Sequence, residues 1–227
     1  MQLDLQLFEA TFIEEGKNRF ICTVNLDGEL IECYVPSSSK LKQYINLEKK
    51  TVLISKNANQ KARTKYSLFA VKYYRKYILL NLNLVNKLLG KYLVTNTELC
   101  VSYEKVIDGY KTDLITNDKN SNNLTIIEAK GIITTKKDEM FPSKYSERAI
   151  KQLKQIKQLL IDGYKVDYYL ISLSPILKNL YYDISHVEFY QLFMDCIANG
   201  LTVKALTVIY ENKEFKIKKL KPPCLKL

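Results

Sequence analysis

The chain is poor in the residues on which several common kinds of site depend. It has one histidine, His186, and its five cysteines, an odd number, include no CxxC pair. A lone histidine argues against catalysis by a Ser-His or Cys-His pair, and His186 fits an ordinary surface or helix-start position. The cysteine pattern argues against a disulfide framework and against a zinc site. We therefore expect free thiols and a cytoplasmic protein.

Long apolar segments and targeting signals are also missing. No apolar run approaches the roughly 20 residues of a membrane span, and the first residues lack the basic region and apolar core of a secretory signal. We expect no membrane partner. Hydrophobic residues still make up 47% of the 227 positions, which is enough to bury a core in one large domain or two small ones.

Acidic residues are outnumbered throughout the chain. There are 35 lysines and arginines against 24 acids, which gives a net charge of +11 and a pI of about 9.2. The excess is spread over both halves, with 13 basic against 8 acidic residues up to position 83 and 22 against 16 beyond it. This balance favours a polyanionic partner, and nucleic acid is the leading candidate. A lysine- and asparagine-rich chain can equally reflect genomic base composition, so that alternative stays open.

The most specific chemistry lies in Asp113 and in the later triplet Glu128-Ala129-Lys130. The surrounding pattern predicts a strand at 111–115, a loop at 117–123 and a second strand at 124–130. Glu128 and Lys130 then share one face of a strand, and an antiparallel partner could bring Asp113 beside them. Magnesium takes one or two carboxylates with waters and phosphate oxygens, and a lysine can orient a water or offset phosphate charge. An ordinary ion cluster on a half-exposed sheet face is the open alternative.

The first eighty residues alternate in short apolar runs that are typical of a small β-barrel. The predicted strands are 20–24, 30–35, 51–54, 66–71 and 77–80, with Asp27-Gly28 as a hairpin turn. Residues 72–77, Lys-Tyr-Tyr-Arg-Lys-Tyr, combine the basic and aromatic side chains that a groove for single-stranded nucleic acid needs. Packing of Tyr73, Tyr74 and Tyr77 into a strand or turn is the alternative interpretation.

Near residue 83 the pattern changes to mixed helices and strands. It predicts helices at 84–93, 144–160 and 187–199, and strands at 99–106, 166–171 and 201–210. Asp108-Gly109 is predicted to turn the chain between two strands. The apolar stripe of the second helix comprises Tyr145, Ala149, Leu153, Ile156 and Leu160. Arg148 and Gln152 flank this stripe, so both are candidates to contact water or phosphate.

Several motifs extend over nearly the whole chain. They are Asn18-Arg19-Phe20, Val24–Glu29, Tyr34-Val35-Pro36, Arg63–Tyr66, Asn86, Glu104, Asp113, Glu128-Ala129-Lys130, Phe141-Pro142 and Ser146-Glu147-Arg148. In order and spacing these residues resemble the sugar fermentation stimulation protein A family. The resemblance implies an OB-like N-terminal domain followed by a PD-(D/E)XK nuclease-like domain, with the core order of helix, three strands and helix.

The chain also departs from that family. Tyr34, Ser37 and Ser39-Lys40 stand where the family has a histidine, an asparagine and a Gly-Arg step. Ser143, Ala149 and Gln152 stand where it has an acid, a glycine and a histidine. Its Glu-Val-Lys is here Glu128-Ala129-Lys130, which keeps both functional side chains. The chain therefore resembles a divergent member with an intact Asp-Glu-Lys set.

Together these observations predict a two-domain protein of mixed α+β and α/β class. An OB-like barrel over residues 1–82 precedes a PD-(D/E)XK restriction-endonuclease-like α/β domain with a mixed central sheet over 83–227. The predicted function is non-specific DNA binding, to single or double strands, with Mg²⁺- or Mn²⁺-dependent phosphodiester hydrolysis. A non-catalytic DNA-binding regulator linked to sugar metabolism is the alternative. The oligomeric state is open, a homodimer included.

The predicted site residues follow from the same reasoning. Asp113 and Glu128 are the metal ligands, and Lys130, Gln152 and the auxiliary acid Glu104 complete the catalytic set. The residues predicted to contact nucleic acid are Arg19, Lys40, Arg63, Lys65, Tyr66, Tyr73, Tyr74, Arg75, Lys144, Arg148 and Lys151.

Overall fold

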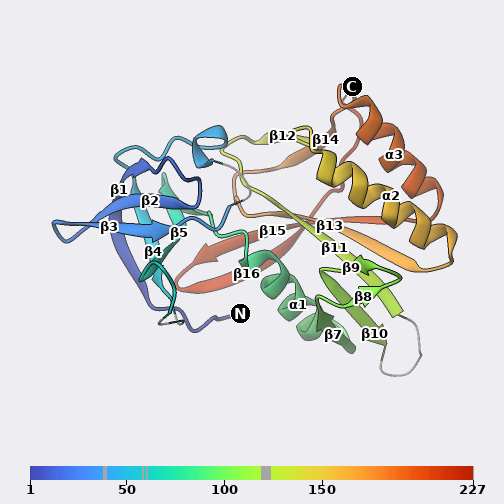
Figure 1. Ribbon diagram of the computed structural model, residues 1–227, viewed down its shortest axis with the longest axis horizontal. Coiled ribbons are helices and arrows are strands. Elements are labelled where there is room, and N and C mark those ends of the chain that lie inside the picture. The colour runs from blue at the N-terminus through green and yellow to red at the C-terminus, as the bar shows by residue number, and fades with distance from the viewer. Residues whose placement is uncertain (38–39, 58, 60, 119–123, 227) are drawn as a thin grey trace.

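The N-terminal part of the chain forms a small closed barrel (Figure 1). The computed structural model describes residues 1–37, 40–57, 59, 61–118 and 124–226. The barrel elements are β1 (Leu7–Glu15), β2 (Ile21–Leu26), β3 (Glu29–Tyr34), the 3₁₀ helix η1 (Leu41–Gln43), β4 (Thr51–Lys56), β5 (Tyr66–Tyr73) and β6 (Lys76–Leu79). The strand order is β3-β2-β1-β4-β5-β6, and a parallel pairing of β3 with β5 closes the sheet.

The barrel has one strand more than the sequence pattern predicts. β1 carries three glutamates and buries only Ala10 and Phe12, so its apolar signal is weak. The turn at Asp27-Gly28 is confirmed, since both residues have positive φ, 53° and 95°, and β2 pairs with β3 around them. Position 39, where the chain departs from the family that it resembles, lies outside the described residues.

The second part is built on a six-stranded mixed sheet with helices on both faces. Its elements are α1 (Leu84–Asn96), β7 (Leu99–Tyr103), β8 (Val106–Ile107), β9 (Tyr110–Lys111), β10 (Leu114–Asp118), β11 (Leu124–Ile132), β12 (Asp138–Phe141), α2 (Glu147–Ile161), β13 (Lys165–Ser172), β14 (Asn179–Tyr182), α3 (Val187–Ala198), β15 (Thr202–Glu211) and β16 (Glu214–Leu220). The order is β16-β15-β13-β11-β10-β7, with β11, β13 and β15 parallel to one another.

The two faces of this sheet have different neighbours. On β11, Ile127 packs into the core that contains α1, whereas Ile126 packs into the core that contains α2 and α3. Figure 1 shows α2 and α3 together on one side of the sheet and α1 on the other. Because strand side chains alternate, Glu128 and Lys130 lie on the α2 face with Ile126.

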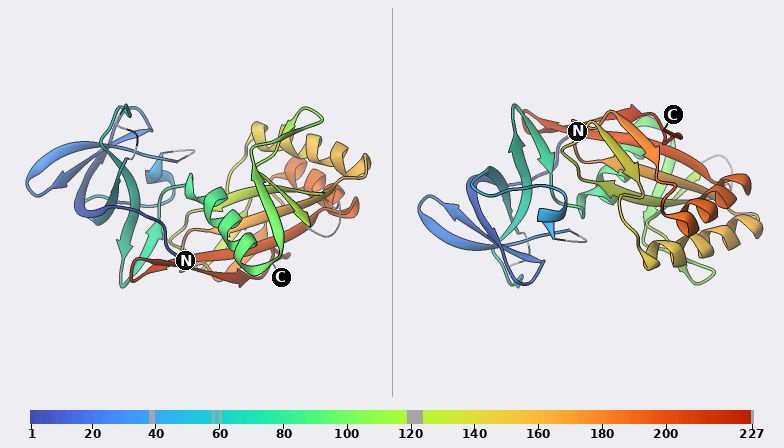
Figure 2. Two further views of the ribbon diagram at one scale, coloured as in Figure 1. Left: turned by 90° about the horizontal axis from the view of Figure 1, so that it is seen from below. Right: turned by 90° about the horizontal axis from the view of Figure 1, so that it is seen from above.

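The barrel and the mixed sheet share one hydrophobic core. Phe69 of β5 makes edge contacts with Tyr210 and Phe215, with ring centroids 5.2 and 6.2 Å apart. The backbone N–H of Leu79 also donates to the carbonyl of Leu173 at 2.9 Å. Figure 2 shows the β15–β16 hairpin reaching from the second lobe to the barrel. The two parts are therefore packed directly on each other.

Three details of the second part differ from the sequence prediction. The single strand predicted at 99–106 is broken, because Glu104 adopts a φ of 51° and β8 and β9 form a separate hairpin. Asp113 lies in a bend just before β10, and β10 extends to Asp118, into the segment predicted as loop. The rest of that predicted loop, 119–123, lies outside the described residues.

The helix carrying Gln152 begins later than predicted. Ser146 is its N-cap, with the side chain accepting a hydrogen bond from the Ala149 N–H at 3.3 Å. Tyr145 therefore precedes the helix and is 57% exposed, so its place in the apolar stripe was wrong. The buried stripe is Ile150, Leu153, Ile156, Leu159 and Leu160. In the part of the chain that the structure describes, no helix is both long and apolar enough to cross a bilayer.

Candidate functional site

Glu128 lies at the centre of a buried hydrogen-bonded cluster on the α2 face of the sheet. It is 1% exposed. Its Oε1 accepts from the Lys130 ammonium at 2.7 Å, and its Oε2 accepts from the Tyr110 hydroxyl at 2.6 Å. The strand places Glu128 and Lys130 on one face, and the β8–β9 turn at Asp108-Gly109 returns Tyr110 to the same place.

Gln152 links the same groups from α2. Its Oε1 accepts from Lys130 Nζ at 2.6 Å, and its Nε2 donates to the Tyr110 oxygen at 3.2 Å. Glu128, Lys130, Gln152 and Tyr110 thus form a closed ring of side chains. The structure brings Gln152 to Lys130, as its place beside the apolar stripe predicts, and the amide provides both the acceptor and the donor that the ring requires.

Asp113 adjoins this ring and is held by two other elements. Its Oδ1 accepts from the Asn86 side chain on α1 at 3.0 Å, and its Oδ2 accepts from the backbone N–H of Ala129 on β11 at 2.9 Å. Hydrogen bonds from α1 and β11 therefore fix Asp113 next to Glu128, although Asp113 is not on a strand. Asn86 and Tyr110 were not predicted as site residues. The signals present in the sequence were Asn86 in the family motif and the position of Tyr110 directly after Asp108-Gly109.

The electrostatics of the site follow from burial and charge. Burial raises the pKa of Glu128, the Lys130 ammonium opposes this, and the nearby Asp113 carboxylate raises the pKa further. Burial and the adjacent Glu128 raise the pKa of Tyr110 well above its usual range. Tyr110 is therefore a neutral hydrogen-bond donor at physiological pH, and Lys130 is the main group that offsets the effect of burial on Glu128.

The donor set fits a hard divalent cation. Asp113 and Glu128 supply two carboxylates, and Mg²⁺ commonly takes one or two with water and phosphate oxygens in the remaining positions. Within the described residues there is no group of three or more His, Cys, Asp and Glu side chains that could form a complete protein cage. Asp113 and Glu128 are therefore the two residues of the cluster that would hold such a cation.

Glu104, predicted as an auxiliary acid, is oriented away from this cluster. Its carboxylate pairs with Lys111 at 2.6 Å, and both side chains are 65% exposed. The backbone N–H of Glu104 donates to the Asp113 carbonyl at 3.1 Å, so the residue supports the Asp113 bend through its main chain. The positive φ of Glu104 turns its side chain to solvent.

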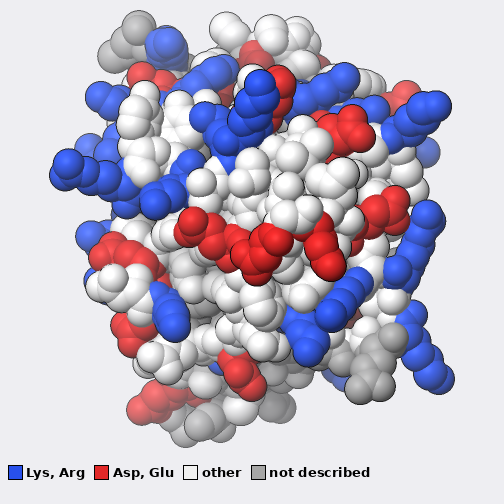
Figure 3. Space-filling model, turned by 90° about the vertical axis from the view of Figure 1, so that its left-hand side faces the viewer, with Lys and Arg blue, Asp and Glu red and all other residues white. Residues whose placement is uncertain are grey.

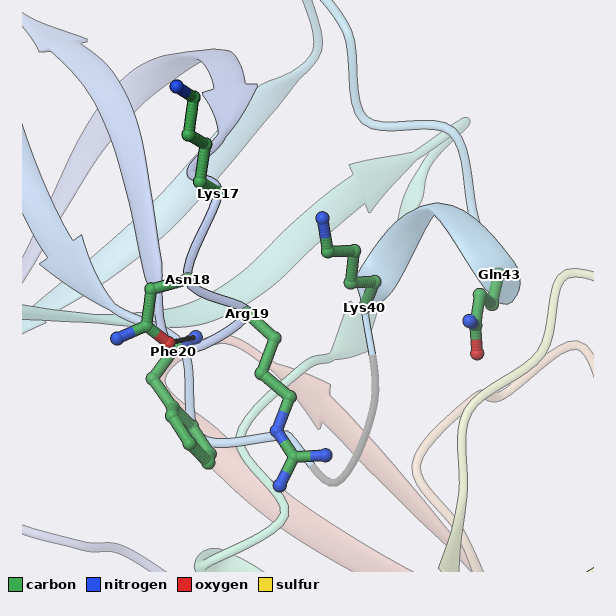
Figure 4. Close-up of a pocket in the computed structure, with 6 residues that line it drawn as sticks. All are labelled: Lys17, Asn18, Arg19, Phe20, Lys40 and Gln43. Carbon is green, nitrogen blue, oxygen red and sulfur yellow. Dashed lines mark hydrogen bonds between the residues drawn. The ribbon is translucent and has the colours of Figure 1, made fainter.

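The predicted nucleic-acid residues divide into several groups. Arg19 and Lys40 line one depression at the end of the barrel (Figure 4). Lys144 Nζ donates to Gln43 of η1 at 2.5 Å and lies 4.3 Å from the Tyr44 ring centre. Arg148 and Lys151 are exposed on the first turns of α2. The structure thus brings Lys144, in the segment just before α2, next to η1, which the sequence did not indicate.

The aromatic candidates differ in their exposure. Tyr66 is 8% exposed and packs edge-on against Phe8, so it belongs to the barrel core and its ring cannot serve as an open stacking platform. Tyr73 is half-buried with Lys50 over its ring, whereas Tyr74 is 85% exposed in the β5–β6 turn beside Arg75. Arg63 and Lys65 line a second depression of about 280 Å³ near Tyr66.

Surface charge is unevenly distributed over the barrel end of the molecule. Figure 3 shows lysines and arginines gathered over the upper part and sides of this face, with a band of acidic residues across its middle. The upper part corresponds to the side on which η1 lies in Figure 1. A polyanion is expected to avoid the acidic band and follow the basic edge.

Comparison with known proteins identifies the family to which this architecture belongs. Residues 15–80 match the family described as the SfsA N-terminal OB domain, and residues 80–214 match the sugar fermentation stimulation protein RE domain. The chain belongs to the sugar fermentation stimulation protein family. Family homologues from Clostridium beijerinckii and Saccharolobus solfataricus are 25% and 30% identical to it. The alignments cover 88% and 87% of this chain and 90% and 78% of the two relatives.

A solved family structure has the same fold. Pyrococcus furiosus SfsA, determined in complex with Ca²⁺, superposes with a TM-score of 0.82 at 16% identity, over 100% of this chain and 98% of the other. This likeness confirms a two-domain α+β architecture of an OB domain and a domain with a mixed curled sheet. At this identity the comparison shows the fold alone.

Proposed function

We propose that this family member is a cytoplasmic, non-specific DNA-binding protein with a Mg²⁺- or Mn²⁺-dependent phosphodiesterase site. The observation that carries the proposal is the grouping of Asp113, Glu128 and Lys130 in one cluster. An Asp followed by Glu-x-Lys is the order of PD-(D/E)XK nucleases, and the family resemblance implies a domain of that class. The basic start of α2 supports a nucleic acid as the substrate, and the free cysteines support a reducing compartment.

Each residue of the cluster has a role in this proposal. Asp113 and Glu128 hold the cation, which when bound would supply positive charge to the scissile phosphate and a water of lowered pKa. The Lys130 ammonium positions the attacking water or offsets the charge that develops on the phosphate. Gln152 orients Lys130, and Tyr110 fixes the Glu128 carboxylate. Asn86 fixes Asp113.

One feature favours a second candidate function, a non-catalytic DNA-binding regulator. Both oxygens of Glu128 are already hydrogen-bonded, to Lys130 and to Tyr110. In this second candidate, the closed network has a structural role alone and holds the sheet, α2 and the β8–β9 hairpin together. In that case DNA binding persists while the cluster has no chemical role.

A cleavage assay separates the two candidates. Pure protein is incubated with circular single-stranded and circular double-stranded DNA in Mn²⁺, in Mg²⁺ and in chelator, and nicked and linear products are separated by electrophoresis. The nuclease proposal expects metal-dependent nicking of at least one substrate. DNA binding without nicking above the chelator control would favour the regulator.

DNA affinity is expected to fall steeply with salt. The basic surfaces neutralise phosphates, and each phosphate contact with duplex DNA contributes a slope of about −0.9 to the logarithm of affinity against the logarithm of salt concentration. Replacing Arg148 with glutamine should make the slope shallower by roughly 1. Lys157→Gln is the control, since Lys157 is already paired with Asp195 at 2.9 Å. An affinity that hardly changes with salt would contradict the prediction.

Tyr110→Phe is expected to weaken Mn²⁺ binding. Removing the hydroxyl leaves Oε2 of Glu128 buried without its donor, and loss of a partner that orients a metal ligand typically lowers affinity by about 10- to 100-fold. Calorimetric titration with Mn²⁺ measures the change. Tyr168→Phe is the matched control, because Tyr168 is 2% exposed and lies opposite Glu128 on β13. Equal Mn²⁺ affinities in the two variants would show that Tyr110 only packs.

A further inference from the structure

A basic depression lies at one end of the barrel, between the β1–β2 turn and η1. Its volume is about 570 Å³, and it is lined by Lys17, Asn18, Arg19, Phe20, Lys40 and Gln43. Figure 4 shows the first four on the turn and the last two at η1, so two separate segments form its walls. Three lining side chains are cationic and none is acidic. The depression is therefore suited to an anionic ligand.

Phe20 gives this depression an aromatic surface. The ring is 37% exposed. The Arg19 guanidinium lies 4.6 Å from its centroid, and the Tyr34 ring stacks near it at 6.4 Å with an interplanar angle of 20°. The Phe20 N–H also donates to Asn18 Oδ1 at 3.1 Å, which fixes the turn (Figure 4). An exposed ring held by its neighbours can stack on a base with little further loss of side-chain entropy.

The position of the depression in the barrel agrees with a nucleic-acid ligand. OB folds bind oligonucleotides with the loop between their first two strands, among other elements, and Lys17–Phe20 occupy that loop here. Lys17 and Lys40 can pair with phosphates, and the Phe20 ring can stack on a base. In a duplex the base faces are covered by stacking, so only a single strand can use Phe20.

The depression is linked to the segment that leads into α2. Gln43 in its wall accepts a hydrogen bond from Lys144, which precedes α2, and Arg148 and Gln152 lie four residues apart on the first turns of that helix. Gln152 in turn bonds to Lys130 of the candidate catalytic cluster. Lys144 and Arg148 are therefore two cationic side chains between η1 and Gln152 in the sequence of contacts that leads from the depression to Glu128.

We propose that this depression is a binding site for single-stranded DNA, in which one base stacks at Phe20 and the adjoining phosphates lie against Lys17, Arg19 and Lys40. The inference rests on the proposed function and narrows it to a protein that engages a single-stranded segment. It assigns strand preference to the barrel, while the metal site acts on any phosphodiester brought to it.

Phe20→Leu tests the role of the ring. Leucine keeps the apolar side chain at this position and removes the π-face, so affinity for a fluorescein-labelled 15-nucleotide oligo(dT) should fall roughly 5- to 150-fold, the effect of one base–aromatic stack. Affinity for a hairpin duplex should stay within about twofold. Anisotropy titrations in chelator measure both. Leu30→Ala is the control, because Leu30 is 66% exposed and pairs with Asn25 at the opposite end of the β2–β3 hairpin.

The outcomes distinguish this inference from the proposed function. A wild-type protein that binds neither DNA overturns the proposed function. A wild type that binds DNA, with a Phe20→Leu variant that binds oligo(dT) equally well, overturns the single-strand site alone. If the Phe20→Leu variant loses equal affinity for oligo(dT) and for the duplex, the single-strand site is also overturned. The ring would then only maintain the shape of a surface that binds both kinds of DNA. Melting temperatures of all variants in chelator exclude unfolding as the cause.

Discussion

Replacing Glu128 with glutamine is expected to reduce metal-dependent DNA cleavage to background, a loss of more than about 100-fold. Changes in groups that merely orient a metal ligand cost 10- to 100-fold in metal affinity or activity, and Glu128 is itself a proposed ligand. Asp113→Asn should have the same effect. DNA binding in chelator should survive both changes, because the basic surfaces are untouched. Nicking of circular DNA in Mn²⁺ and anisotropy in chelator measure the two properties.

Thermal melting shows whether Glu128→Gln loses cleavage because it loses a metal ligand or because it unfolds. Because burial raises the pKa of Glu128, its ionised form opposes folding, and Glu128→Gln in chelator should melt no lower than the wild type. Mn²⁺ should raise the melting temperature of the wild type and not of the variant. Glu188→Gln is the matched control, since Glu188 pairs with Lys154 at 3.2 Å and is 54% exposed. Nicking by Glu128→Gln at the wild-type rate would end the nuclease proposal.

Lys130→Ala is expected to retain metal binding and lose turnover, by about 10²- to 10⁴-fold, as when a group that stabilises charge or transfers protons is removed. A protonated lysine has no free electron pair for a cation, so its removal leaves the ligand set of Asp113 and Glu128 in place. Single-turnover nicking in saturating Mn²⁺ measures the rate, and calorimetry measures the metal affinity.

Lys204→Ala is the matched control for this variant. Lys204 also pairs with a buried carboxylate, Asp167 at 2.6 Å, and Asp167 alternates with Tyr168 on β13 and so lies on the opposite face of the sheet. Both variants leave a buried acid without its cation. If both lose turnover equally, instability is the cause and the catalytic role of Lys130 is wrong.

The pH dependence of stability gives a second readout for Lys130. The ammonium holds the pKa of Glu128 down against burial, so Lys130→Ala should raise that pKa further. An acid with a raised pKa in the folded state binds more protons there than in the unfolded chain. Stability therefore falls as pH rises above the ordinary carboxyl pKa. In chelator, the deficit of Lys130→Ala relative to the wild type should grow from acidic to neutral pH.

Local features of the fold were predictable because nearby residues determine them. The two-residue period of a strand places Glu128 and Lys130 on one face, and the turns at Asp27-Gly28 and Asp108-Gly109 form where glycine can adopt positive φ. The helix with Gln152 follows from its apolar spacing. These features need no information about distant parts of the chain.

The sequence by itself therefore determined the two-part architecture, the Glu-x-Lys pair and the excess of basic charge. Only the tertiary structure decided that Asp113 reaches Glu128 from a bend, held by Asn86 of α1, and that Tyr110 completes the ring. It also decided the burial of Tyr66 and the exposure of Phe20, two aromatic residues whose local sequences are equally basic. Burial and contacts between distant residues depend on how whole elements pack, and no local pattern in a chain encodes that packing.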